Sequence, residues 1–183
     1  MTAELRAQIL KALWAEPAKS RLSVWGILDC ARDPGIYLAL LESKLEFRCL
    51  YSGKLPRELE MVAPHLVELF PTNRLVNRWL DEGWGDAWGV LLKIDDAANL
   101  RLHLRRFLKV HDESGQRMLF RYYDPRVLRV YLPTCNPAEL QQVFGPVKNY
   151  ITEGADGESM CVFNLAMGAL HCSTVPSLAG DLP

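Results

Sequence analysis

Short apolar runs of strand length alternate with stretches of helical spacing along most of the chain, and this alternation limits the fold more than any other feature. The predicted strands are residues 24–28, 47–51, 65–69, 87–94, 118–122, 147–152 and 159–165. Apolar residues recur at helical spacing in 4–15, 36–41, 75–80, 100–108 and 127–131. Such an order is typical of a sheet covered by helices. It predicts the α/β class: a mixed, mostly parallel sheet with helices on both faces and a C-terminal antiparallel hairpin at the edge.

A capping side chain followed by proline marks the start of three predicted helices. The three pairs are Asp33-Pro34, Asp124-Pro125 and Asn136-Pro137. Each capping side chain can accept hydrogen bonds from free N–H groups of the first turn, and proline suits the first helical position because that position needs no donor. Glu139 completes a capping box with Asn136. These helices are therefore predicted to begin at the three prolines.

Length and composition favour one ordinary globular domain. The chain has 183 residues, of which 49% are hydrophobic and 23% charged. We expect a single domain over residues 1–172 and a flexible tail over 173–183, where residues are small and polar. The formal net charge of −1 argues against nucleic acid as the main partner, because that binding needs a surplus of basic side chains.

The five cysteines and the lack of a long apolar run indicate the compartment. The cysteines are odd in number and widely spread, without a CxxC pair, which suits a reducing cytoplasm. No apolar run approaches the roughly 18–20 residues that span a bilayer. The first residues lack the pattern of a secretory signal. The sequence therefore predicts a cytoplasmic protein without a membrane partner.

No motif for catalysis, a cofactor or a metal is visible. A glycine-rich phosphate loop, a GxSxG elbow and an HExxH helix are all lacking, and the four histidines have no ligand spacing. One enzymatic alternative stays open: Asp29 and Cys30 follow a predicted central strand, where open α/β sheets bind ligands. If folding brings His65 or His103 close, Cys30 could act as the nucleophile of a small hydrolase or transferase.

The segment Phe120 to Arg126 is a second candidate site. Arg121, Asp124 and Arg126 are predicted to meet at a strand-to-helix corner. They could grip an anion or a carboxylate of a ligand. The interpretation that we favour is structural: Asp124 caps its helix while an arginine pairs with it to fix the corner.

Residues 120–128, with the sequence FRYYDPRVL, resemble the signature of the bacterial type VI secretion effector-chaperone (adaptor) domain family. Further family-like segments follow in the family's order, at residues 27–32, 49–53, 63–67, 88–90, 103–108 and 144–146. The resemblance covers about residues 22–150, the family-like core of the chain. Many members carry a sizeable C-terminal lobe, so we expect this chain to select its partner through its core or its tail.

The resemblance implies a non-enzymatic cytoplasmic adaptor. Such a protein binds a type VI effector toxin and promotes its loading onto the VgrG spike, and it needs no cofactor. An immunity-type binding protein of the same system is the alternative within this class. The partners implied are therefore the effector and the VgrG spike protein.

Two sets of residues follow from the resemblance. The structural signature is expected to hold strand ends and helix starts in place, and comprises Asp29, Arg105, Arg121, Tyr123, Asp124, Pro125 and Arg126. Breaking one partner of a buried pair in this set would cost about 3–5 kcal/mol. The candidate partner-binding residues are Leu5 and Ile9 on the first helix, the indoles of Trp79 and Trp84, and Val162 and Phe163 at the edge of the C-terminal hairpin. For each of the two tryptophans, packing in the core is the interpretation that we favour over partner contact.

Overall fold

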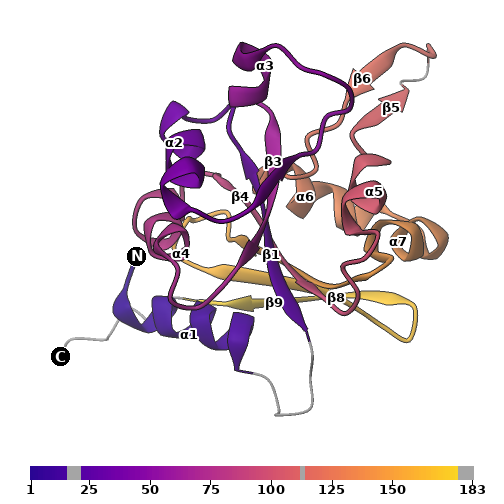
Figure 1. Ribbon diagram of the computed structural model, residues 1–183. Helices are drawn as coiled ribbons and strands as arrows, with labels where there is room; N and C mark the ends of the chain where they lie inside the picture. The colour runs from indigo at the N-terminus through magenta and orange to yellow at the C-terminus, as the bar shows by residue number, and fades with distance from the viewer. Residues whose placement is uncertain (16–21, 112–113, 177–183) are drawn as a thin grey trace.

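The computed structural model describes residues 1–15, 22–111 and 114–176, which form a sheet with helices on both sides (Figure 1). The helical elements are α1 (Ala3–Trp14), α2 (Pro34–Ser43), α3 (Arg57–Met61), α4 (Arg74–Arg78), the π-helix η1 (Trp79–Gly83), α5 (Leu100–Arg105), α6 (Pro125–Tyr131), the 3-10 helix η2 (Leu132–Thr134) and α7 (Pro137–Phe144). The strands are β1 (Ser23–Asp29), β2 (Phe47–Cys49), β3 (Pro64–Leu69), β4 (Gly89–Ile94), β5 (Lys109–His111), β6 (Arg117–Leu119), β7 (Val147–Glu153), β8 (Met160–Ala166) and β9 (Ala169–Val175). No described helix is long and apolar enough to cross a bilayer.

The main sheet has seven strands in the order β2-β3-β1-β4-β7-β8-β9. Every strand pair within the described residues is antiparallel, including the separate two-stranded sheet of β5 and β6. The prediction of a mostly parallel sheet is therefore wrong.

The error has a topological cause. A helix-containing crossover leads from β1 to β2 through α2, and another leads from β3 to β4 through α4 and η1. In both cases the two strands run in the same direction, but a third, antiparallel strand lies between them: β3 separates β2 from β1, and β1 separates β3 from β4. Strand–helix–strand order along the chain therefore reflects two split βαβ units, in which no two parallel strands are neighbours.

Two hydrophobic cores cover the two faces of the sheet. α1, α2, α4 and η1 pack on one face, with Ile9 and Leu40 buried there. α5, α6 and α7 pack on the other face, with Leu104 and Leu128 buried there. Figure 1 shows these two groups of helices on opposite sides of the sheet. Helices on both faces were part of the predicted architecture, and the structure shows them.

The C-terminal region holds a three-stranded meander. β7 and β8 form the predicted hairpin, but β9 pairs along the whole length of β8. The edge of the sheet is therefore β9, and Val162 and Phe163 of β8 lie inside the sheet. β9 runs through Val175 and so includes residues 173–175, the first three residues of the predicted tail. Residues 177–183 of that predicted tail lie outside the described residues.

The predicted helix starts are confirmed. Asp33, Asp124 and Asn136 all cap their helices through side-chain oxygens, and Glu139 completes the capping box. The sequence reading missed α3, β5 and β9, all of which are exposed or only partly buried. Little hydrophobic periodicity marks such elements, since little of their surface is buried.

We predict that Gly89→Ala destabilises the fold strongly. A Cβ at position 89 would collide with the backbone carbonyl oxygen of Ile27 in the neighbouring strand β1. Because that atom belongs to the backbone of β1, which is hydrogen bonded to strands on both sides, it cannot move aside cheaply, and we expect a loss of about 3 kcal/mol or more. The control is Gly53→Ala, where a positive φ of 85° strains the backbone but nothing lies within 4 Å of the new Cβ. We expect that control to lose only about 1 kcal/mol. Urea unfolding measures both, and equal losses would contradict the steric argument.

Candidate functional site

Asp29 and Arg121 join the C-terminal end of β1 to the corner that precedes α6. Asp29 is the last residue of β1 and is fully buried, with 0% of its surface exposed. Its carboxylate accepts a hydrogen bond from the Arg121 guanidinium, and the two groups form an ion pair. The backbone N–H of Asp29 donates to the carbonyl oxygen of Trp88 at 2.8 Å, and the N–H of Ala31 donates to the Asp29 carboxylate at 3.3 Å. A buried carboxylate is costly without such a partner, so this pair fixes the position of residue 121 on the end of β1.

Asp124 and Arg126 form the second ion pair of the corner. Asp124 Oδ1 accepts from the backbone N–H of Arg126 at 2.9 Å, as a helix cap, and from Arg126 Nε at 3.0 Å. Arg126 Nη2 donates to Oδ2 at 2.6 Å. Burial opposes ionisation of the carboxyl, but the hydrogen bonds from Arg126 and its positive charge prevail and lower the pKa of Asp124 below its usual range. Asp124 is therefore ionised at neutral pH and already paired within the protein.

The aromatic residues of the corner lie in the second core. The Tyr122 hydroxyl donates to the carbonyl oxygen of Leu104 at 2.9 Å, which ties the corner to α5. Tyr123 is 1% exposed and hydrogen bonds with the Tyr51 side chain, and burial raises its pKa. Pro125 is the first residue of α6 and is buried. Since both carboxylates are paired and both tyrosines are buried, the geometry favours the structural alternative for this corner over an anion-binding one.

Folding brings Cys30 and His65 together, as the enzymatic alternative requires, but inside the core. Cys30 Sγ lies 3.5 Å from His65 Nδ1, and their exposed fractions are 1% and 0%. His65 Nδ1 also lies 2.9 Å from the carbonyl oxygen of Ala63, so Nδ1 carries the proton and donates it there. This nitrogen cannot then accept the thiol proton. Burial, and next the charge of Asp29, raise the pKa of Cys30 to about 12. His103 bonds to the carbonyl oxygen of Val143 instead.

The predicted partner-binding residues are not on the surface. Five of the six are buried in the cores: Leu5, Ile9, Trp79, Trp84 and Phe163. Val162 is half-buried and packs against the first core. A docking surface needs exposed side chains, so the site must be sought elsewhere on the molecule. For Trp79 and Trp84, packing in the core is the arrangement observed.

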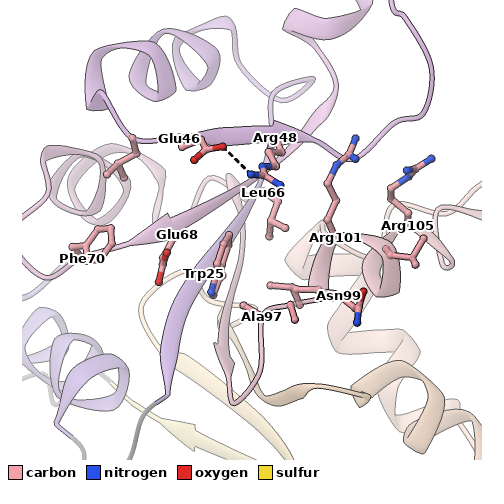
Figure 2. Close-up of a pocket in the computed structure, with 14 residues that line it drawn as sticks. Trp25, Glu46, Arg48, Leu66, Glu68, Phe70, Ala97, Asn99, Arg101 and Arg105 are labelled. Atoms are coloured by element: carbon pink, nitrogen blue, oxygen red, sulfur yellow. Dashed lines mark hydrogen bonds and ion pairs between the residues drawn. The ribbon is translucent and has the colours of Figure 1, made fainter.

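A hollow of about 660 Å³ lies between the outer strands of the sheet and α5 (Figure 2). Trp25, Leu66 and Glu68 contribute from β1 and β3, while Arg101 and Arg105 project from α5. The Arg101 guanidinium is engaged, because Nε and Nη2 donate to the carbonyl oxygen of Cys49 at 2.9 and 2.8 Å. Glu46 pairs with Arg48 at 2.8 Å on one wall of the same hollow. The hollow therefore carries charges of both signs, and three of its charged side chains, Glu46, Arg48 and Arg101, are already engaged within the protein.

A second hollow of about 560 Å³ lies on the other side of α5 and shares Leu102 and Arg105 with the first. We call it the α5 groove. Its lining residues come from the loop after β2, from α5 and its C-terminal end, and from β5 and β6: Leu50, Tyr51, Ser52, Leu55, Leu102, Arg105, Arg106, Leu108, Lys109 and Leu119. Arg105 thus lies on the wall of both hollows rather than in the ion pairs of the corner.

The sequence reading missed the exposed residues of the α5 groove. Leu102 is 55% exposed and Leu119 is 49% exposed. One signal was available in the sequence: Leu102 falls outside the apolar stripe of its helix, which runs through Leu100 and Leu104. A large aliphatic side chain on the polar side of a helix, next to basic residues, is a candidate contact residue.

No group of three or more histidine, cysteine, aspartate or glutamate side chains in the described part of the chain could hold a metal ion. The Cys30–His65 contact and the ion pairs of the corner therefore give no metal centre. Of the two hollows described above, the α5 groove is the one whose walls are aliphatic and basic.

The comparisons with known proteins give one match. The profile of a family described as a domain of unknown function (DUF4123) matches residues 24–142, about two thirds of the chain. The match contains both ion pairs of the corner and the whole α5 groove. No curated protein and no solved structure shows a significant match.

We predict that Arg121→Met lowers the free energy of unfolding by about 3 kcal/mol, because it leaves the Asp29 carboxylate buried without its charged partner. Adding Asp29→Asn should recover part of this loss, since the second change removes the unpaired charge. Arg126→Met should cost less, because Arg126 is more exposed than Arg121, at 53% against 39%, and Asp124 keeps a shorter backbone hydrogen bond than Asp29 does, at 2.9 Å against 3.3 Å. Urea unfolding of the four proteins gives the comparison. A double variant less stable than Arg121→Met would show that the pair is not the source of the loss.

We predict that Cys30 does not react with iodoacetamide in the folded protein. Its thiol is buried and its raised pKa of about 12 keeps it protonated at neutral pH. Cys172 is exposed on β9 and should be alkylated under the same conditions. Mass spectrometry of the digested protein distinguishes the two sites. Native alkylation of Cys30 at the rate of Cys172 would revive the enzymatic alternative.

Proposed function

We propose, starting from the fact that this chain belongs to the DUF4123 family, that it is a non-enzymatic cytoplasmic adaptor that binds a type VI secretion effector and promotes its loading onto the VgrG spike. The observation that carries the proposal is the FRYYDPRVL segment at residues 120–128, together with the family-like segments on either side of it. The family match spans most of these segments in one stretch.

The physical character of the molecule supports a binding role. An adaptor needs a stable scaffold and an exposed surface for its partner. Here two cores and a seven-stranded sheet supply the scaffold. The surface has open hollows with exposed leucines, of which the α5 groove is one.

The electrostatics at the end of β1 argue against the hydrolase or transferase alternative. A cysteine nucleophile needs a lowered pKa and access for its substrate. Cys30 has a raised pKa and is 1% exposed. Burial also lowers the pKa of His65, so a stabilising imidazolium beside the thiol is disfavoured. The neighbouring Asp29 raises the thiol pKa further, because its negative charge opposes a thiolate.

The adaptor proposal predicts a specific partner. We expect the tagged chain, expressed in a bacterium with an active type VI system, to co-purify with one large effector, and deletion of its gene to abolish delivery of that effector alone. Cys30→Ala should leave both results unchanged, because the thiol has no catalytic task in an adaptor. Recovery of the chain without any effector while the secretion genes are expressed would contradict the proposal. Loss of delivery in a folded Cys30→Ala variant that still binds the effector would favour an enzyme.

A further inference from the structure

The α5 groove combines an aliphatic floor with a basic rim. Five leucines contribute to its walls, and together they come from the loop after β2, from α5 and its end, and from β6: Leu50, Leu55, Leu102, Leu108 and Leu119. Leu50 and Leu108 are buried and form the floor, whereas Leu102 and Leu119 are half exposed at the mouth. Exposed leucines beside a hollow lose contact with water when a partner covers them, so the mouth favours an apolar partner.

All the charges that line the groove have one sign. Arg105, Arg106 and Lys109 are the charged residues of its lining, and no carboxylate lines it among the described residues. This differs from the chain as a whole, whose formal net charge is −1. It also differs from the neighbouring hollow, where Glu46 and Glu68 offset the arginines. The three cations of the groove thus form a local positive field over an aliphatic floor.

We propose that the α5 groove binds an acidic segment of a partner protein that carries aliphatic side chains. The aliphatic side chains would cover Leu102 and Leu119 and fill the hollow, and the carboxylates would face Arg105, Arg106 and Lys109. The identification of the partner protein as the effector rests on the proposed adaptor function; the chemistry of the bound segment does not. The positive charges of the groove favour a negatively charged partner segment, and its leucine floor favours one with apolar side chains.

The lining favours a protein segment over nucleic acid. Proteins that bind single-stranded nucleic acids stack the bases on several aromatic side chains along a basic groove. The α5 groove offers one aromatic residue, Tyr51, and five leucines. Tyr51 is moreover only partly exposed and hydrogen bonds with Tyr123. Aliphatic walls of this kind match leucine, isoleucine or valine side chains of a peptide.

The test uses the full chain and a display library of short random peptides. We expect the selected peptides to be rich in aspartate and glutamate together with leucine or isoleucine, and their binding to weaken as salt is raised. A synthetic peptide of the consensus sequence, measured by fluorescence anisotropy, then serves as the probe for variants.

Two matched pairs of variants locate the binding. Leu102→Glu should weaken binding of the peptide by about tenfold or more, because the substitution removes an apolar contact and adds a charge that repels the acidic peptide. Its control is Leu41→Glu on α2, an equally exposed helical leucine at 52% against 55%, on the other face of the sheet. Arg106→Glu should also weaken binding of the peptide, whereas its control, Arg74→Glu at the exposed start of α4, should leave binding unchanged. All four positions are at the surface, so circular dichroism should show unchanged folding.

Three results would overturn the proposal: no selected peptide, a consensus that is basic or lacks aliphatic residues, or equal binding by Leu102→Glu and wild type. Co-purification of the effector distinguishes a failure of this proposal from a failure of the proposed adaptor function. If Leu102→Glu recovers the effector as well as wild type does, the adaptor function stands and the groove is wrong. If wild type recovers no effector but acidic aliphatic peptides bind at Leu102, the groove stands and the effector is not its occupant.

Discussion

The ion pair between the buried Asp29 and the partly exposed Arg121 is the interaction on which the arrangement of the two halves of the molecule depends. Asp29 ends β1, an inner strand of the sheet that lies between β3 and β4, and Arg121 lies 92 residues further along the chain, just before α6. The segment between β4 and β7 leaves the sheet and covers one of its faces with α5, α6 and α7. The Asp29–Arg121 pair holds one point of this long segment against the end of β1, and the neighbouring Asp124 cap determines where α6 begins. The position of α5 follows through the Tyr122–Leu104 hydrogen bond.

This construction separates the recognisable segment from the surface available for binding. Residues 120–128 carry the resemblance, yet most of their polar side chains are buried or already form ion pairs and helix caps within the protein. The α5 groove has no comparable motif, since an aliphatic floor and a basic rim are assembled from the loop after β2, α5, β5 and β6. A signature of this kind therefore identifies the scaffold, whereas the chemistry of the partner is set by side chains that the scaffold positions.

Local chemistry was readable from the sequence, and strand neighbours were not. The caps at Asp33, Asp124 and Asn136 depend on a few adjacent residues, so the helix starts were predicted correctly. Parallel pairing was inferred from strand–helix alternation, but the inserted strands β3 and β1 depend on contacts between distant segments. The Asp124–Arg126 pair was one of the two alternatives weighed, whereas the Asp29–Arg121 pair needed the fold. Apolar periodicity marked Leu5, Ile9 and Trp79 as important, but a stripe of that kind indicates burial, not partner contact, and all three are in the core.

The most direct test of this division between scaffold and binding surface is hydrogen–deuterium exchange of the purified chain, free and in complex with its effector. We expect binding to slow exchange in the loop at residues 50–55 and in α5 and its C-terminal end, while residues 121–131 exchange equally slowly in both states. Protection confined to the corner at residues 121–131, or to the edge strand β9, would contradict this expectation and place the partner on a different surface.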